Sequence, residues 1–359
     1  MNLKDIVNRD RQSLADCASE PIHIPGSIQP NGVLLGLDEA LVVRFCSANC
    51  ADAFGIAPAA LLQRPLRELD AALAASVEAA LAQPDPRDKP RRHTAAGKSW
   101  DLFAGPTDDG HILVELECCS TATLNNADLF DQTRDFIRHI ERSRDLQELC
   151  ARIATQVRAI SGYDRVMIYR FDPDYNGEVF AESRADDMEP FLGLHYPHTD
   201  IPVQARELYL RNLMRVINDV HYEPVPILTV DEGKPATLDL SDALLRSVSP
   251  IHIQYLRNMG VGATLTISLL LDGNLWGLIA CHHRGPLQLT HRQRQAALMQ
   301  GHFLTSQIRV RQVAEEYGIY TVVEAHLQQL LKALPAAGLF HAAAQRRGDM
   351  FFKKLSACR

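Results

Sequence analysis

Apolar and polar positions alternate in short runs over residues 27–124, which predicts a small domain of mixed strands and helices. Strands are expected at 33–37, 41–45, 100–104 and 111–117, the last two as a hairpin across an Asp-Asp-Gly turn. Helical spacing covers 51–73 with breaks at Gly55 and Pro58, and the Pro- and Arg-rich stretch 83–98 is expected to be a surface loop. Residues 1–26 are expected to be irregular, because Pro21, Pro25, Gly26 and Pro30 forbid a helix at their end.

A longer period begins near residue 130. Apolar residues recur there at steps of three and four from Phe136 to Ile160, which predicts a long amphipathic helix ended by Gly162. Strands are expected at 165–171, 263–271 and 275–281, helices at 205–215 and 291–317, and one helix, or two broken at Pro250, over 241–259. These elements predict a second α+β domain over 130–312, in which helices flank an antiparallel sheet, followed by a connecting helix and tail over 313–359.

Composition excludes several classes of protein. The 359 residues carry a formal net charge of -7 and no long Lys/Arg run, so a nucleic-acid partner is not expected. No apolar run is long enough to span a bilayer and the N-terminus lacks an apolar leader, so we expect a cytoplasmic protein without a membrane partner. Two small α+β domains in tandem with a long exiting helix are typical of a signalling input module.

Two segments bring reactive side chains next to prolines. Cys17 lies in a polar stretch ahead of a proline-rich strap, where an exposed thiol is either a covalent attachment point or a surface residue without a role. Asp200 stands between Pro197 and Pro202, so its carboxylate is either a positioned acceptor or the N-cap of the following helix.

Two later segments carry polar groups on elements that are otherwise apolar. Four residues recur at three-residue steps, and share a face if one helix continues across Pro250: Arg246, Ser249, His252 and Tyr255. Such a face is either a binding surface or a solvated one. An apolar strand ends at His282, whose imidazole points either into a cavity or into the core. A metal-dependent hydrolase is disfavoured because no compact ligand pair such as HExxH or CxxC is present.

Taken in order, five stretches resemble the PAS and GAF signatures of bacteriophytochromes: EPIHIPGSIQP, YDRVMIYRF, YPHTDIPVQARELY, LRSVSPIHIQYLRNMG and LWGLIACHH. The resemblance runs from about residue 12 to about residue 315. It implies tandem PAS and GAF domains, with an N-terminal segment threaded through a GAF loop as a knot. It also implies a red/far-red photoreceptor that binds biliverdin, a linear tetrapyrrole, and signals by Z/E photoisomerisation to an output domain.

The same resemblance implies a role for each candidate residue. Cys17 would attach ring A of biliverdin IXα through a thioether. Asp200, beside Ile201 and Pro202, would offer its backbone carbonyl to the pyrrole N–H groups, and His252 would approach them through a water. The two propionates would be held by Arg215 and Arg246, helped by Tyr209, Ser249, Thr264 and Thr266. His282 would bond the ring D carbonyl, with Tyr169, Phe191, Tyr196 and Tyr255 packed around that ring.

Two positions depart from the family pattern: His198 stands where a small residue is usual, and Asn31 where histidine is usual. The family's PHY domain and histidine kinase output are not found in these residues, so we expect a photosensory module and not an enzyme. Without PHY, photoconversion is expected to be incomplete and fluorescence stronger. A stable, fully formed far-red-absorbing state after red light would contradict this expectation.

The expected partners are the bilin and a second copy of the chain, because the long amphipathic helices offer more apolar surface than one small sheet covers. A monomer in sedimentation analysis would contradict the homodimer. A response regulator would be reached only through the missing output domain. The alternative function is a PAS-GAF sensor of haem or a cyclic nucleotide, which Cys17 and the two arginines disfavour because neither ligand needs covalent capture.

Overall fold

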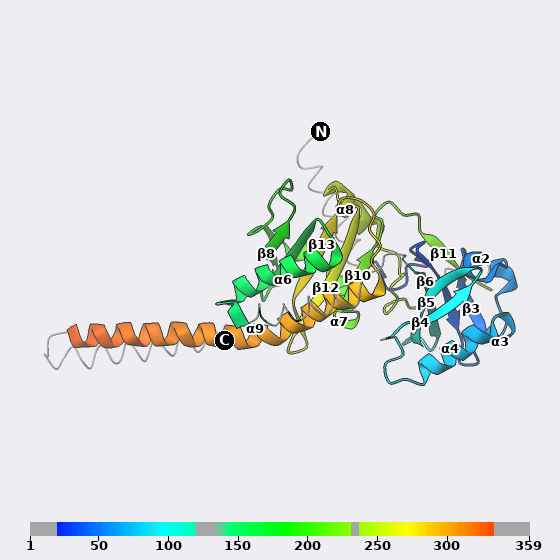
Figure 1. The fold of residues 1–359 in the computed structure, drawn as a ribbon, viewed down its shortest axis with the longest axis horizontal. Helices are drawn as coiled ribbons and strands as arrows, with labels where there is room; N and C mark the ends of the chain where they lie inside the picture. Colours follow the sequence, from blue (N-terminus) through cyan, green and yellow to red (C-terminus); the bar gives the residue numbers. More distant parts are fainter. Residues whose placement is uncertain are drawn as a thin grey trace. The chain divides into compact units, whose positions relative to one another are not determined.

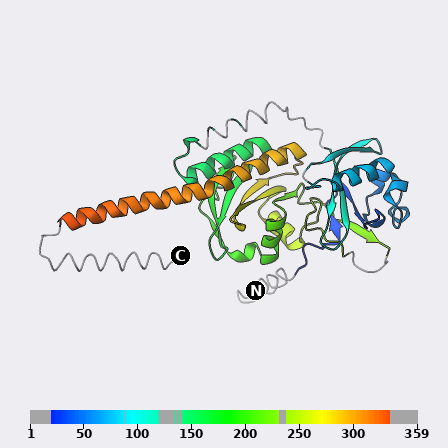
Figure 2. The same ribbon diagram turned by 90° about the horizontal axis from the view of Figure 1, so that it is seen from below.

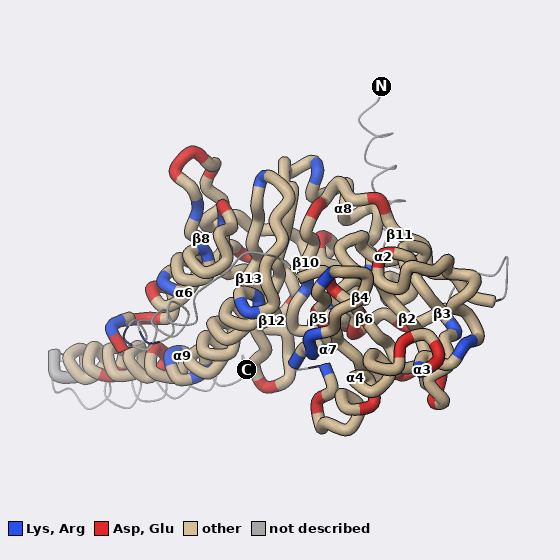
Figure 3. The backbone as a smooth tube through the Cα atoms, turned by 45° about the vertical axis from the view of Figure 1, so that its right-hand side comes forward, with Lys and Arg blue, Asp and Glu red and all other residues tan. Residues whose placement is uncertain are grey.

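The computed structural model describes residues 20–87, 89–119, 134, 138, 141–230 and 237–333. The chain divides into two compact units, 1–305 and 306–359. The first unit holds the first expected α+β domain and residues 130–305 of the second, and helix α9 (His291–Ala333) continues from the first unit into the second (Figure 1). None of the described helices is both long and apolar enough to cross a membrane. Basic and acidic residues are interspersed along the described backbone (Figure 3).

The first domain is built on a seven-stranded sheet in which every pair is antiparallel, in the order β1-β11-β3-β2-β6-β5-β4. Its strands are β1 (Ser27–Ile28), β2 (Gly32–Leu37), β3 (Val43–Ser47), β4 (Arg91–Ala95), β5 (Lys98–Pro106), β6 (Ile112–Cys118) and β11 (Val225–Thr229). Strand β11 belongs to the sequence of the second domain. The predicted hairpin of β5 and β6 is confirmed, whereas β4 was expected to be loop. Pairing with β5 orders β4, with His93 buried.

Short helices replace the single broken helix expected over 51–73. They are α2 (Ala51–Phe54), the 3-10 turn η1 (Pro58–Ala60), α3 (Leu66–Leu69) and α4 (Ala71–Leu81). Gly55 ends α2 in the left-handed conformation, and the Asp70 carboxylate accepts a hydrogen bond from the Leu73 amide to start α4 anew. These helices cover one face of the sheet, where Val33 and Leu35 of β2 point.

Strand β2 is buried on both faces because its other face meets the second domain. Leu34 packs with Leu238 and Leu245 in a cluster of residues from both domains. The approach is close enough that a Cβ on Gly32 would lie 2.7 Å from a methyl carbon of Leu245. The two domains therefore share one apolar layer.

The second domain has a six-stranded antiparallel sheet in the order β10-β12-β13-β7-β8-β9. Its strands are β7 (Arg165–Phe171), β8 (Gly177–Arg184), β9 (His195–Tyr196), β10 (Met214–Ile217), β12 (Ala263–Leu271) and β13 (Asn274–His283). Helix α6 (Leu146–Ser161) and the part of α9 before residue 306 cover one face. On the opposite face lie η2 (His198–Asp200), α7 (Val203–Arg211) and α8 (Pro250–Asn258) (Figure 2).

Three helices of this domain differ from the prediction at their ends. The helix expected from Phe136 is interrupted within the described residues, because Asp145 caps α6 through the Glu148 amide. Helix α7 ends at Arg211 because the next residues enter strand β10. The segment 241–249 is not helical, and Pro250 stands in the first turn of α8, where its missing N–H costs nothing.

The N-terminal segment 22–29 lies between two parts of one connection of the second domain. On one side Ser27 and Ile28 pair with Pro226 and Val225 of β11. On the other side Gln29 N–H donates to the Leu245 carbonyl over 2.7 Å. The predicted knot depends also on residues 231–236, which lie outside the described residues, so it stays a prediction.

A buried ion pair joins the two domains, and it generates a prediction. Arg294 of α9 bonds both oxygens of Glu117 on β6, with side chains 1% and 6% exposed. Arg294→Met leaves this carboxylate uncompensated and is expected to lower the free energy of unfolding by about 3–5 kcal/mol in urea titrations. Arg67→Met, at the exposed Arg67–Glu78 pair, is the control and should cost less than about 1 kcal/mol. Equal losses in the two variants would contradict the prediction.

Candidate functional site

Two adjoining cavities open between the sheet of the second domain and η2, α7 and α8. Their volumes are about 200 Å³ and about 110 Å³. Seven residues line both, so the two form one continuous slot: Asp200, Ile201, Tyr209, His252, Tyr255, Thr264 and Thr266. Every candidate residue named from the sequence lines this slot, apart from Cys17, which lies outside the described residues.

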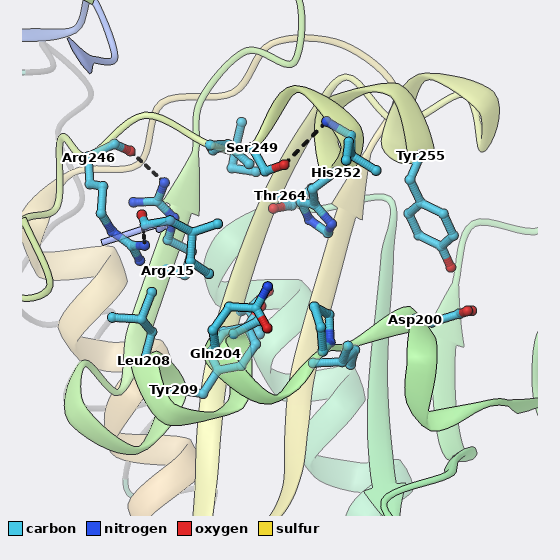
Figure 4. Close-up of a pocket in the computed structure, with 18 of the residues that line it drawn as sticks. Asp200, Gln204, Leu208, Tyr209, Arg215, Arg246, Ser249, His252, Tyr255 and Thr264 are labelled. Carbon is cyan, nitrogen blue, oxygen red and sulfur yellow. Dashed lines mark hydrogen bonds between the residues drawn. The ribbon is translucent and has the colours of Figure 1, made fainter. Parts of the chain in front are cut away.

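Two guanidinium groups occupy one end of the slot (Figure 4). Arg215 of β10 donates through Nη2 to the carbonyls of Arg246 and Ser247, and Arg246 donates through Nη1 to the Ile22 carbonyl over 3.0 Å. Neither forms an ion pair with a carboxylate among the described residues, and the buried Arg215 Nη1 and Arg246 Nε have no hydrogen-bond partner. Burial, followed by repulsion from Arg215, lowers the pKa of Arg246 to about 9.

The middle of the slot is formed by hydroxyl groups and an imidazole. Thr264 and Thr266 are adjacent inward positions of β12, because alternate strand residues share a face. His252 projects from the first turn of α8 and presents its ring to the cavity (Figure 4). Burial by the surrounding protein, with a smaller effect of Arg215, lowers its pKa to about 4, so this imidazole is neutral at neutral pH.

The opposite end is aromatic. Tyr169, Phe191 and Tyr196 pack in one apolar cluster on the sheet, and the Tyr169 and Tyr196 ring centroids are 6.0 Å apart. The ring of Tyr169 crosses β8 over Gly177, where a Cβ would lie 1.8 Å from its Cζ atom. His282 lines this end from β13, its buried Nδ1 has no hydrogen-bond partner, and burial lowers its pKa to about 4.

Asp200 lies at the junction of the two cavities. Pro202, and not Asp200, occupies the N-cap position of α7, so the N-cap alternative for Asp200 is wrong. Burial raises the pKa of its carboxyl, and burial, with a smaller effect of the Asp200 charge, raises the pKa of Tyr255 to about 12. The carboxylate is therefore held among phenols at the start of the aromatic end.

The three-residue spacing around Pro250 does not create a shared helix face. Arg246 and Ser249 precede α8, and only His252 and Tyr255 lie on it, with ring centroids 6.0 Å apart. The four side chains still meet in the slot, because the irregular segment before α8 runs along the cavity edge. The four residues thus line one cavity, whereas the shared helix face expected from their spacing is absent.

Sequence reasoning missed the apolar part of the lining. These residues include Met167, Val179, Leu208, Met214, Val248 and Leu278. Met167 and Val179 belong to strands whose inward faces look like ordinary core, so no signal in the chain separates cavity lining from core at these positions. The two departures from the family pattern lie elsewhere: Asn31 donates to Glu117, and His198 lines neither cavity.

Comparisons with known proteins agree with this architecture. The PAS fold family matches residues 17–119 and the GAF domain family matches residues 145–308. Cyanobacterial phytochrome B of Nostoc sp. is 38% identical over 88% of this chain and 43% of its own length. A bacteriophytochrome of Xanthomonas campestris is 42% identical over 77% of this chain and 44% of its own length. The chain thus spans less than half the length of these curated relatives.

Solved structures of similar extent exist. A variant of the chromophore-binding domain of Stigmatella aurantiaca bacteriophytochrome is 40% identical, with a TM-score of 0.75, covering 82% of this chain and 99% of that one. The chromophore-binding domain of an unusual bacteriophytochrome from R. palustris is 36% identical, with a TM-score of 0.76, covering 84% and 99%.

The fold and the slot therefore define a tandem PAS–GAF sensory module with its ligand cavity in the GAF domain. The chain belongs to the bacteriophytochrome family and contains the region that corresponds to the family's chromophore-binding domain.

The low pKa of His282 predicts how the stability of the ligand-free protein depends on pH. Its pKa falls from 6.5 to about 4 on folding, so between these values the unfolded chain binds more protons. The free energy of unfolding should therefore fall as the pH decreases through this window. In urea titrations from about pH 7 to about pH 5, His282→Gln should show a smaller fall than the wild type. His302→Gln, at an exposed position of α9, is the control, and a fall unchanged in His282→Gln would refute the prediction.

Proposed function

We propose that this chain is a red/far-red light-sensing module that binds biliverdin IXα in the GAF slot, covalently through Cys17. The observation that carries the proposal is the pair of guanidinium groups, Arg215 and Arg246, which line the same cavity and form no ion pair with a carboxylate among the described residues. A linear tetrapyrrole brings two propionates, and guanidinium groups bind carboxylates in matching geometry. Family membership supports the same ligand class.

The residues fit such a ligand at both ends of the slot. Tyr209, Ser249, Thr264 and Thr266 would add hydroxyl groups near the propionates. The aromatic end suits a planar ring, and His282 lines this end, where its imidazole would bond a carbonyl of the ligand. Since His282 is neutral at neutral pH, it can donate one hydrogen bond without adding a charge.

The bilin, when bound, supplies the light absorption and the Z/E isomerisation. The protein holds the bilin, orients it and tunes its protonation. Asp200 offers its backbone carbonyl to the pyrrole N–H groups, and an acceptor at that point favours their protonated form. The apolar lining of Met167, Val179 and Leu278 keeps water from the far end of the slot.

We further propose that the module works as a homodimer and reaches a response regulator only through a segment outside these residues. The described part of α9 after Ser306 exposes several large apolar side chains, among them Val310, Val313, Tyr317, Ile319 and Tyr320. A helix with such a surface suits pairing with a second copy.

Mixing apoprotein with biliverdin tests cofactor and attachment together. The wild type is expected to develop a strong red absorption band and covalent colour, visible as zinc-induced fluorescence on a denaturing gel. Cys17→Ala should keep a red band without covalent colour, because only the thiol can form the thioether. No red band in either protein would remove the proposal and favour a PAS-GAF sensor of haem or a cyclic nucleotide.

The arginine pair predicts how affinity depends on the propionates. In a Cys17→Ala background, where binding is reversible, Arg246→Gln should weaken biliverdin binding by about 10- to 100-fold, the worth of a charge-assisted hydrogen bond. It should leave the binding of biliverdin dimethyl ester unchanged, because the ester has no carboxylate for Arg246 to bind. Arg257→Gln, outside both cavities, is the matched control. Equal weakening of acid and ester in Arg246→Gln would contradict the assigned role.

A further inference from the structure

The turn that carries Asp200 is short and has no side-chain cap of its own. It consists of η2 between Pro197 and Ile201, and neither η2 nor the following helix α7 has a side-chain hydrogen bond at its N-cap. A three-residue turn with so few bonds does not by itself hold a carbonyl or carboxylate in a fixed direction. Some other group must therefore fix the position of Asp200.

Arg206, in the second turn of α7, reaches back to this turn. Its Nη1 atom donates to the Ile201 carbonyl over 2.6 Å and to the His198 carbonyl over 3.3 Å. These two carbonyls stand on either side of Asp200 in the chain. Arg206 forms no ion pair with a carboxylate among the described residues, so its charged hydrogen bonds go to the backbone of this turn.

The guanidinium of Arg206 in turn contacts a residue of the turn between β7 and β8. Its Cζ atom lies 4.5 Å from the ring centroid of Tyr175, a cation–π contact. Tyr175 adopts a positive φ of 62° and packs edge-on against Phe171, with centroids 5.8 Å apart. Phe171 in turn packs edge-on against Tyr169 of the slot, at 5.3 Å.

A second bond ties the same turn to η2. The Asn176 side-chain oxygen accepts from the His198 amide over 3.2 Å, and Asn176 is fixed by the Asp172 carboxylate over 3.0 Å. The turn Asp172–Asn176 thus contacts η2 directly and through Arg206.

We infer that Arg206, seated on Tyr175, is a positioning residue that fixes the Asp200 turn and so sets the acceptor offered to the chromophore. Arg206 lines neither cavity, so it acts on the ligand only through η2. The spectroscopic consequence rests on the proposed function, whereas the effect on η2 belongs to the ligand-free protein.

The first measurement is hydrogen exchange of the amides of residues 198–201 in the apoprotein. Arg206→Ala should exchange these amides about tenfold faster, because a charge-assisted restraint is lost. Tyr175→Leu should also make the exchange of these amides faster. The matched control is Arg170→Ala, which removes a cation–π contact of 4.0 Å with Phe180 and an ion pair with Glu178, both on the neighbouring strand β8, without touching η2.

The second measurement is a pH titration of the biliverdin-loaded protein followed by its red band. The apparent pKa of the bound chromophore should fall by about one unit in Arg206→Ala and stay unchanged in Arg170→Ala. Arg206→Lys keeps the charge but not the planar fork and should recover only part of either effect.

The inference is overturned if Arg206→Ala matches Arg170→Ala in both measurements, or if Arg206→Lys restores both fully. If the wild type takes up no bilin, the proposed function fails, and the exchange experiment still decides whether Arg206 fixes η2. If Arg206→Ala does not fold, as judged by circular dichroism, Tyr175→Leu and Arg206→Lys decide the question by the same two measurements.

Discussion

Two positive charges buried side by side are the constraint on which much of the first unit depends. Arg246 is buried, Arg215 is half-buried, and neither has a carboxylate partner among the described residues, a situation that costs free energy unless other groups replace the lost water. The replacing groups are backbone carbonyls of Ile22, Arg246 and Ser247. This requirement for acceptors is met by carbonyls that lie outside the helices and strands of the described residues.

The same requirement places the N-terminal segment against the GAF domain. Ile22 can accept from Arg246 only if residues 22–29 lie beside residues 245–247, and Gln29 holds them there with bonds to the Val216 and Arg246 carbonyls. Once this segment is fixed, β1 pairs with β11, and β11 completes the PAS sheet at β3. The segment that accepts a hydrogen bond from Arg246 is therefore also the segment that joins the two domains. The Arg294–Glu117 ion pair joins them at a separate point of the interface.

Much of this arrangement could be predicted from the chain, and the failures have physical causes. Strands β7, β12 and β13 were predictable because β-branched residues and an Asp-Gly-Asn turn act locally. Strands β4 and β11 were not, since each is ordered by a distant partner and not by its own composition. The slot residues followed from the family motifs, but their meeting does not come from one helix face. Arg206 escaped notice because its hydrogen-bond partners are carbonyls, which leave no trace in a sequence.

Some polar atoms of the slot form hydrogen bonds within the protein, whereas others have no hydrogen-bond partner. Arg215 donates to two backbone carbonyls and Arg246 to one, while one nitrogen of each has no partner, and Nδ1 of His282 likewise has none. Folding therefore bears the cost of placing these groups, and an anionic planar ligand of the proposed kind would recover it on binding. Since a ligand that binds only the folded chain stabilises it by mass action, such a cavity links occupancy to stability. The carboxylate of Asp200 disfavours a second negative charge at the aromatic end, so the polarity of the slot would orient the proposed ligand as well as hold it.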